Sequence, residues 1–379
     1  MDLKNIREHL DSIDREITRL LVERMDAVGE VAASKKSTGK AIRDRARERE
    51  IINRVTEQAG DTYAPYVKDL YKLILELSRS YQSKLLANVT PLTKQLSEAC
   101  ETYAGKKFPN RALVACQGTE GAYAQQACEK LFEYPDILYF DSFDGVFNAV
   151  EKGMCEYGIL PIENSTAGSV TQVYDLMEKH SFHIVGARKL RIDHRLMRKP
   201  GAKGPIKEIV SHEQALRQCS EFFAAHSEYK AVPMENTAVA AEFVANSDRD
   251  DLAVIAAKPC AELYDLEIVN DSISNSQSNY TRFICISRKM EVYPDARKIS
   301  ITCNLPHEAG SLNSIISRLA IAGVNLCKLE SRPIPGREFE FRFFFDMEAD
   351  LHDPEIVKLI CELEARTEHF VFLGAYEER

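Results

Sequence analysis

Basic side chains on the first predicted helix are spaced so that they could converge on a small anionic ligand. Arg24 and Lys35 are eleven residues apart, which puts them on nearly the same helix face, about 16 Å apart along the axis. Arg7 lies about 25 Å from Arg24 and is turned by about 100°, so a second chain would have to bring it to the same small ligand. Charged helix residues more often form a solvated surface, and that alternative applies here too.

Two later groups of polar residues each share one face of a predicted helix. Asp44, Arg47 and Glu48 stand at positions i, i+3 and i+4, and Ser78 and Gln82 stand at i and i+4. Taken alone, these are ordinary surface pairs. Taken in order with the first helix, they add hydroxyl, amide and carboxylate groups to a set of cations.

The order of all these residues resembles that of the AroQ-type chorismate mutases, and the resemblance covers residues 1–88. It implies the rearrangement of chorismate to prephenate, which needs no nucleophile, metal or cofactor, because the enzyme only folds the substrate and stabilises charge. The resemblance implies that the substrate carboxylates are bound by Arg24, Arg47 and Arg7 of a partner chain. It implies that the ether oxygen accepts hydrogen bonds from Lys35 and Gln82. The substrate hydroxyl would be anchored, and the basic groups ordered, by Asp44, Glu48 and Ser78.

Polar segments in the middle of the chain lie beside predicted strand ends, where ligands bind in open α/β sheets. They are PIENSTAGSV (161–170), SHEQALRQC (211–219) and NYTRF (279–283). Each alone also suits a helix cap or a turn. A fourth segment, GTEGAYAQQA (118–127), lacks the third glycine and the GK[ST] of a phosphate cradle, so it favours a turn that offers N–H groups to a carboxylate.

Together these segments resemble the prephenate dehydratase family, whose hallmark is Thr-Arg-Phe, over residues 110–288. The resemblance implies a two-lobed α/β domain, like a periplasmic binding protein, that converts prephenate to phenylpyruvate. We expect Thr281 to meet the departing hydroxyl as an acid or a hydrogen-bonding group, and Arg282 to hold charge or support the loop. His194 and His212 lack an accompanying acid or nucleophile motif and are interpreted as structural. The other candidate substrate ligands are Asn164, Ser165, Thr166 and Gln214.

Two C-terminal segments, HEAGSL (307–312) and ESRP (330–333), lie where a predicted strand meets a helix or a turn. A capped helix and a turn would explain them structurally. Both also resemble the regulatory ACT domain of prephenate dehydratases, which implies phenylalanine binding at a subunit interface and feedback inhibition. The candidate phenylalanine ligands are Gly310, Ser311, Leu312, Glu330, Ser331, Arg332 and Pro333.

The elements that must position these residues change in kind along the chain. Apolar residues at helical spacing from Leu3 predict a first helix of about 30 residues that is broken at Thr38 and Gly39. Further helices are predicted at 43–58 and 65–86, with Gly60 and Asp61 in the turn between them, so the first 88 residues are expected to be all helical. A polar linker at 89–109, with Pro91, Gly105 and Pro109, follows.

After the linker, short apolar runs alternate with helical ones, which indicates an α/β domain at 110–288. Its strands are predicted at 112–116, 137–140, 157–161, 183–187, 208–211, 252–256 and 281–287. From 298 to 376 the predicted order is strand, helix, strand, strand, helix, strand, which is that of an α+β ferredoxin-like unit. The chain is therefore predicted to be multidomain.

Composition limits the possible functions. The 379 residues suggest two or three domains, and a net charge of -9 argues against a nucleic-acid-binding surface. The ten cysteines are scattered without metal-ligand spacing, and no apolar run reaches the length of a membrane span, so we expect a cytoplasmic enzyme without metal or cofactor. Chorismate, prephenate and phenylalanine are the expected ligands, in a homodimer or higher homo-oligomer. Arogenate dehydratase activity and a non-catalytic amino-acid sensor remain alternatives.

Overall fold

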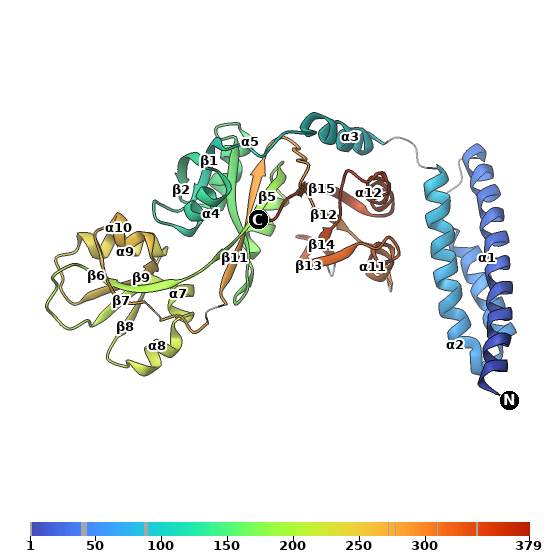
Figure 1. The fold of residues 1–379 in the computed structure, drawn as a ribbon, viewed down its shortest axis with the longest axis horizontal. Helices are drawn as coiled ribbons and strands as arrows, with labels where there is room; N and C mark the ends of the chain where they lie inside the picture. Colours follow the sequence, from blue (N-terminus) through green and yellow to red (C-terminus); the bar gives the residue numbers. More distant parts are fainter. Residues whose placement is uncertain are drawn as a thin grey trace. The chain divides into compact units, whose positions relative to one another are not determined.

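The protein forms two compact units (Figure 1). The first unit holds Met1–Leu96, Pro306–Gly323 and Asp353–Glu368, and the second holds Ser97–Leu305, Val324–His352 and His369–Arg379. The computed structural model describes residues 2–38, 44–86, 90–271, 273–276, 278–308, 310–338 and 340–379. None of the helices within these ranges combines the length and the apolar character that a membrane span requires.

Two long helices, α1 (Leu3–Thr38) and α2 (Arg45–Leu86), pack side by side in the first unit. Gly60 interrupts α2 with a φ of 68° and a ψ of 165°, which confirms the predicted break between two helices. A positive φ costs glycine little because it has no Cβ. Pro65 lies five residues after Gly60, near the start of the second part of the helix, where a missing backbone N–H is better tolerated than in a helix interior. The predicted boundaries at Gly39 and Arg43 lie outside the described residues.

The region predicted as a linker, 89–109, contains a helix, α3 (Pro91–Tyr103), so that prediction was wrong for most of its length. Thr90 begins this helix, since its Oγ1 accepts the backbone N–H of Thr93 at 3.1 Å. Proline suits the first position of a helix, where its N–H would have no partner. The apolar side chain of Leu96 is fully buried.

The first lobe of the second unit is a sheet with the strand order β2-β1-β3-β11-β5, and a short β4 pairs with β3. β1 runs parallel to β2 and β3, whereas β11 is antiparallel to both of its neighbours. The strands are β1 (Arg111–Gln117), β2 (Tyr134–Phe140), β3 (Tyr157–Asn164), β4 (Gly168–Ser169), β5 (His183–Arg191) and β11 (Tyr280–Ser287), and the helices are α4 (Tyr123–Leu131), α5 (Phe143–Glu151) and α6 (Thr171–Met177).

The second lobe is a five-stranded sheet with the order β10-β6-β9-β7-β8. The chain enters it from β5 and returns to the first lobe at β11, so two connections join the lobes. Its strands are β6 (His194–Arg198), β7 (Glu208–His212), β8 (Lys230–Met234), β9 (Leu252–Ala257) and β10 (Glu267–Asn270), and its helices are α7 (Glu213–Arg217), α8 (Ser220–Ala225), α9 (Thr237–Asn246) and α10 (Pro259–Leu263).

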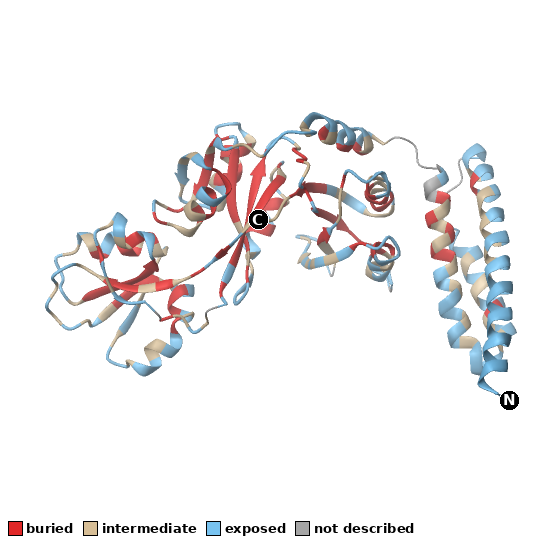
Figure 2. Cartoon of the chain, viewed as in Figure 1, coloured by how far each residue is buried: buried red, intermediate tan, exposed pale blue. Residues whose placement is uncertain are grey.

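All seven predicted α/β strands are present, and the sequence missed four more. β8 and β10 lie at the sheet edges, where strands are short and a proline such as Pro233 is tolerated. β6 carries His194 and two arginines among its five residues, so it lacks the apolar run that predicts a buried strand. Figure 2 shows that buried residues concentrate in the strands of the two lobes.

The C-terminal strands form a third sheet in the second unit, with the order β13-β14-β12-β15. The chain order, with helices between the first and second and between the third and fourth strands, is the predicted ferredoxin-like order. The elements are β12 (Lys298–Asn304), α11 (Ser311–Ile321), β13 (Asn325–Pro333), β14 (Phe341–Glu348), α12 (Pro354–Arg366) and β15 (Glu368–Tyr376).

Candidate active sites

Two neighbouring strands of the first lobe bring the central candidate residues together. β3 and β11 pair antiparallel, and their register sets Thr281 opposite Asn164 and Arg282 opposite Glu163. Because successive side chains point to opposite faces of a sheet, Thr281 and Asn164 share one face while Arg282 and Glu163 share the other. The strand pairing therefore separates two residues that are adjacent in the Thr-Arg-Phe segment.

Asn164 is the centre of a buried hydrogen-bond network. Its Nδ2 donates to Thr281 Oγ1 at 2.9 Å and to Asn279 Oδ1 at 2.8 Å. Its Oδ1 accepts from Thr166 Oγ1 at 2.7 Å and from the backbone N–H of Ala167 at 2.9 Å. The Thr281 hydroxyl accepts a hydrogen bond from the amide, so its own proton can be donated to a bound molecule. Thr281 is only 8% exposed, which keeps this donor out of bulk water.

A pocket of about 580 Å³ opens beside this network between the two lobes. Thr166 and Asn279 line it from the first-lobe side, and Gln214 and Gln218 line it from the second lobe. Gln218 Nε2 donates to Thr166 Oγ1 at 3.1 Å, which joins the lobes across the pocket. The full lining is Thr166, Ala167, His212, Glu213, Gln214, Arg217, Gln218, Ser274, Asn275, Ser276 and Asn279.

Among the lining residues that were not sequence candidates, Gln218 and Asn279 contact the candidate residues directly. Gln218 stands four residues after Gln214, so helical spacing from a residue already chosen would have pointed to it. Asn279 precedes the Tyr-Thr-Arg-Phe segment, and its role depends on the pairing of β3 with β11. Sequence spacing carries no signal for a pairing of that kind.

His194 lies behind the pocket in a structural position, as expected. Its Nε2 is 2.9 Å from Gln218 Oε1, and its Nδ1 is 3.2 Å from the Tyr123 hydroxyl. Burial lowers the pKa of His194, so the ring is neutral at pH 7 and supports Gln218 without carrying charge. His212 lines the pocket and caps α7, because its Nδ1 accepts the backbone N–H of Gln214 at 3.2 Å.

Ser165 and Arg282 were predicted to serve the site directly, and the structure uses both elsewhere. The Ser165 hydroxyl donates to the Ser278 carbonyl at 3.1 Å and accepts the Tyr280 N–H at 2.9 Å, so it ties two backbone segments together. Arg282 is 4% exposed on the opposite face from Thr281 and forms ion pairs there. Of the two roles predicted for Arg282, support of the loop fits these contacts better than direct contact with a substrate in the pocket.

The turn at 118–127 also differs from its predicted role. The N–H of Gly121 bonds to Gln125 Oε1 at 2.7 Å, and the Gly121 carbonyl accepts from Cys260 Sγ at 3.6 Å. A Cβ at Gly121 would lie 3.0 Å from that sulfur. The turn therefore packs the two lobes together, and its Gly121 N–H is not offered to a ligand carboxylate.

The helical candidates of the first unit meet where α1 packs against α2. Arg24 donates to the Ser78 hydroxyl, and Gln82, one turn further along α2, is buried with its Nε2 3.3 Å from the Ser78 carbonyl. Burial lowers the pKa of Arg24, although its guanidinium stays charged at neutral pH. Lys35 is half-buried on the same helix as Arg24, and Arg7 lies exposed towards the start of that helix.

The remaining three candidates lie at the start of α2. Asp44 Oδ1 accepts the backbone N–H of Arg47 at 3.0 Å, so this carboxylate caps the helix. Glu48 forms an ion pair with Arg79, and the Arg47 side chain is exposed and pairs with Glu50 at 2.6 Å. The structure thus groups Arg24, Ser78 and Gln82, whereas the Arg47 side chain pairs with Glu50 at the start of α2.

Comparison with known proteins supplies the family. The family model for prephenate dehydratase matches residues 114–291, and the model for chorismate mutase type II matches residues 6–83. The bifunctional chorismate mutase/prephenate dehydratase of Enterobacter agglomerans is 31% identical over 384 residues, which covers 98% of this chain and 95% of that protein. The chain belongs to this bifunctional family.

Other relatives share the dehydratase part. Arogenate dehydratase/prephenate dehydratase 6 of Arabidopsis thaliana is 33% identical over 281 residues, covering 69% of this chain and 68% of that protein. A prephenate dehydratase of Arthrobacter aurescens, solved in complex with L-Phe, is 25% identical with a TM-score of 0.63, over 70% of this chain and 89% of that one. GqqA, described as a quorum quenching acylase, is 28% identical with a TM-score of 0.64, and the match covers 70% of this chain and 98% of that one. Because one fold carries differently named activities, function must be argued from the site.

The two candidate phenylalanine segments of this bifunctional enzyme occupy different units. Gly310 begins α11 with a φ of 92°, and Ser311 and Leu312 are the first residues of that helix. Residues 330–333 end β13, where Ser331 pairs with Phe343 of β14 and Pro333 with Phe341. Each segment therefore lies at the end of an element, as the sequence predicted.

Polar side chains at the end of β13 contact the dehydratase domain. Arg332 donates to Asp175 Oδ1 of α6 at 2.8 Å, and Ser169 of β4 donates to Glu330 at 2.5 Å. These contacts lie within the second unit. The end of β13 is therefore attached to the first lobe as well as to its own sheet.

Proposed function

We propose that the N-terminal helices convert chorismate to prephenate and that the two-lobed domain converts prephenate to phenylpyruvate. The observation that carries the second step is the Asn164–Thr281 hydrogen bond beside the pocket between the lobes, in a chain that belongs to the bifunctional family. All ten cysteines are free, and such thiols suit the reducing cytoplasm, where we place the enzyme.

In the dehydratase step, the substrate loses its ring hydroxyl and a carboxylate as the ring becomes aromatic. A proton must reach the departing hydroxyl, and Thr281 is the donor because Asn164 occupies its acceptor side. Thr166, Gln214 and Gln218 border the pocket with amide and hydroxyl groups that can hold the substrate carboxylates. Burial of Thr281 strengthens its hydrogen bond, because water does not compete there.

In the mutase step, the enzyme holds a dicarboxylate in a folded shape while an ether C–O bond breaks. Arg24 and Arg47 bind carboxylates through guanidinium forks, together with Arg7 of a second copy. Lys35 and Gln82 donate to the ether oxygen as negative charge develops on it. The remaining polar residues anchor the substrate hydroxyl and order these groups: Asp44, Glu48 and Ser78.

A second copy of the chain completes the mutase site. An apolar stripe on α1, which we define as Leu3, Ile6, Leu10, Ile13 and Ile17, is 41% to 60% exposed in the single chain. Residues at this spacing form one continuous helix face that a partner helix can cover. Arg7 stands beside the stripe, so covering the stripe brings Arg7 against the other chain. Homodimerisation and catalysis are thereby linked.

The C-terminal ferredoxin-like module acts as an ACT-type sensor for phenylalanine. The Arthrobacter relative was solved with L-Phe, which supports an amino-acid ligand for this class of dehydratase. Gly310 leaves room for a ligand at the start of α11, and a helix N-terminus favours a carboxylate. The other proposed ligands are Ser311, Leu312, Glu330, Ser331, Arg332 and Pro333. Phenylalanine bound there inhibits the dehydratase step by reciprocal coupling.

The purified chain should form prephenate and then phenylpyruvate when it is incubated with chorismate. Prephenate and phenylpyruvate are followed by absorbance, and arogenate is supplied in parallel as a comparison substrate. Faster turnover of arogenate than of prephenate would make the chain an arogenate dehydratase. Absence of turnover with either substrate, together with phenylalanine binding, would identify a non-catalytic sensor instead.

The mutase step should depend little on mild alkalinity. Gln82 donates through an amide at any pH, so we expect kcat for chorismate to change by less than about twofold between pH 7 and 8.5. The matched variant Gln82→Glu needs a protonated carboxyl to donate, and burial raises the pKa of such a group. Its activity should persist below that pKa and fall as the pH rises through it. A steep fall for the unmodified chain would remove Gln82 from the mechanism.

A further inference from the structure

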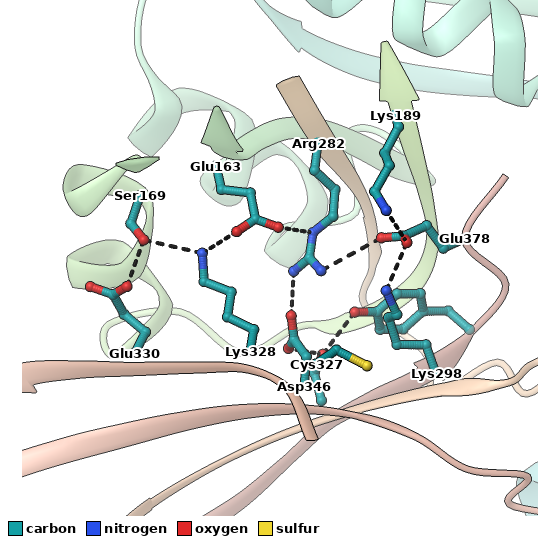
Figure 3. A network of polar contacts seen from close by, with 12 residues as sticks. Glu163, Ser169, Lys189, Arg282, Lys298, Cys327, Lys328, Glu330, Asp346 and Glu378 are labelled. Atoms are coloured by element: carbon teal, nitrogen blue, oxygen red, sulfur yellow. Dashed lines mark hydrogen bonds and ion pairs between the residues drawn. The ribbon is translucent and has the colours of Figure 1, made fainter. Parts of the chain in front are cut away.

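A continuous chain of polar contacts joins the end of β13 to the strands that carry the dehydratase site (Figure 3). Ser169 donates to Glu330 at 2.5 Å, and Lys328 donates to the same Ser169 hydroxyl at 3.1 Å. Lys328 also forms an ion pair with Glu163, whose carboxylate lies 3.0 Å from Arg282 Nε. We call these five residues the β13 relay.

The β13 relay ends in a buried cluster of charges. Arg282 pairs with Asp346 of β14 and lies 3.5 Å from Glu378, and Asp346 accepts a 2.6 Å hydrogen bond from Ser300 of β12. Burial opposes the charge of Arg282, yet these carboxylates raise its pKa, so the guanidinium stays charged. A buried charge in this cluster cannot exchange its partner for water when a neighbouring residue moves. It must keep an ionic partner, because an unpaired charge inside the protein costs free energy.

The β13 relay lies directly behind the dehydratase site. Glu163 precedes Asn164 on β3, and Arg282 follows Thr281 on β11. Asn164 pairs with Thr281, and this pair faces the pocket. Glu163 pairs with Arg282 at the next position, and this pair belongs to the β13 relay. A shift of Glu163 or Arg282 therefore displaces the backbone that sets the Asn164–Thr281 hydrogen bond.

We propose that the β13 relay transmits phenylalanine binding at the end of β13 to the Asn164–Thr281 pair, and so mediates inhibition of the dehydratase step. This proposal rests on the sensor function proposed above. Glu330 is both a proposed phenylalanine ligand and the first member of the β13 relay. Phenylalanine binding that shifts Glu330 changes the contacts of Ser169 and Lys328. A shift of Lys328 then changes its ion pair with Glu163, and with it the ion pair between Glu163 and Arg282.

Lys328→Met tests the β13 relay with little risk to folding. Glu163 keeps Arg282 as an ionic partner in this variant, so no buried carboxylate is left without a cation. We expect basal dehydratase activity and phenylalanine affinity, measured by calorimetry, to stay within about threefold, whereas the concentration for half-inhibition rises at least about tenfold. Ser169→Ala, which removes the hydroxyl between Lys328 and Glu330, should act in the same direction if the methionine variant folds poorly.

Lys189→Met is the matched control. Lys189 pairs with Glu378 at 2.9 Å and stands opposite Arg282 on β5, so it borders the same charge cluster away from β13. We expect its inhibition to match that of the unmodified chain. Full inhibition of both Lys328→Met and Ser169→Ala, with phenylalanine bound, would overturn the β13 relay alone. An unmodified chain that phenylalanine neither binds nor inhibits would instead overturn the sensor function, and the relay with it.

Discussion

Replacing Thr281 with alanine should abolish phenylpyruvate formation while prephenate still accumulates from chorismate. The Thr281 hydroxyl accepts from Asn164 Nδ2 at 2.9 Å, and alanine removes the only proton that this position can give to the departing hydroxyl. Loss of a positioned proton donor typically slows a reaction by about 10²- to 10⁴-fold, so dehydratase kcat should fall by that factor. The measurement is kcat for prephenate, with the chorismate reaction followed in the same sample.

Two variants show whether the hydroxyl or the side-chain volume matters. Thr281→Ser keeps the hydroxyl and should retain most of the activity. Ser165→Ala removes a neighbouring hydroxyl whose two contacts are to backbone groups, so its effect on kcat should be small compared with its effect on stability. Near-normal dehydratase turnover in Thr281→Ala would exclude Thr281 as the donor. The mutase reaction, carried by the helices of the first unit, serves as the internal measure of folded protein.

The sequence predicted which segments form the dehydratase site, but it could not assign every residue within them. Thr281 and Asn164 were chosen as separate candidates because each stands near the end of a predicted strand, and the pairing of β11 with β3 places them opposite each other. The sequence left two roles open for Arg282, because alternation along a strand shows that two successive residues face opposite ways without showing which of them faces the pocket. The direction in which Arg282 points is set by the pairing of β11 with β3 and by its contact with the carboxylate of Asp346, which is 64 residues away in the chain.

The fold was predictable where local signals were strong. The break in α2 follows from Gly60, and the buried apolar strands follow from their composition. The helix α3 was missed because Pro91 and Gly105 were interpreted as loop residues, although a proline after the capping residue Thr90 equally begins a helix. Helical spacing from Gln214 pointed towards Gln218, but the contact of Gln218 with Thr166 joins segments 52 residues apart and carries no sequence signal.

Two inactive mutase variants should recover activity when their subunits are mixed. In the proposed dimer, each site takes Arg24 from one chain and Arg7 from the other, and the apolar stripe on α1 forms the contact. Arg7→Ala and Arg24→Ala should each lose most chorismate turnover, because each removes a carboxylate-binding guanidinium from both sites. A mixed dimer then contains one site with both arginines and one site with neither.

Random exchange of the two variants should restore about a quarter of the normal activity, since half of the dimers are mixed and each has one complete site. The matched control mixes Arg24→Ala with Arg47→Ala. Both residues come from the same chain in the proposed site, so each site in that mixed dimer lacks one arginine and no recovery is expected. Subunit exchange is verified by native mass spectrometry.

Mixed dimers of Arg7→Ala and Arg24→Ala that stay inactive would show that Arg7 does not act across the interface. Because the two chains contribute different residues, activity recovered after verified exchange reports on the sharing of the site between the chains.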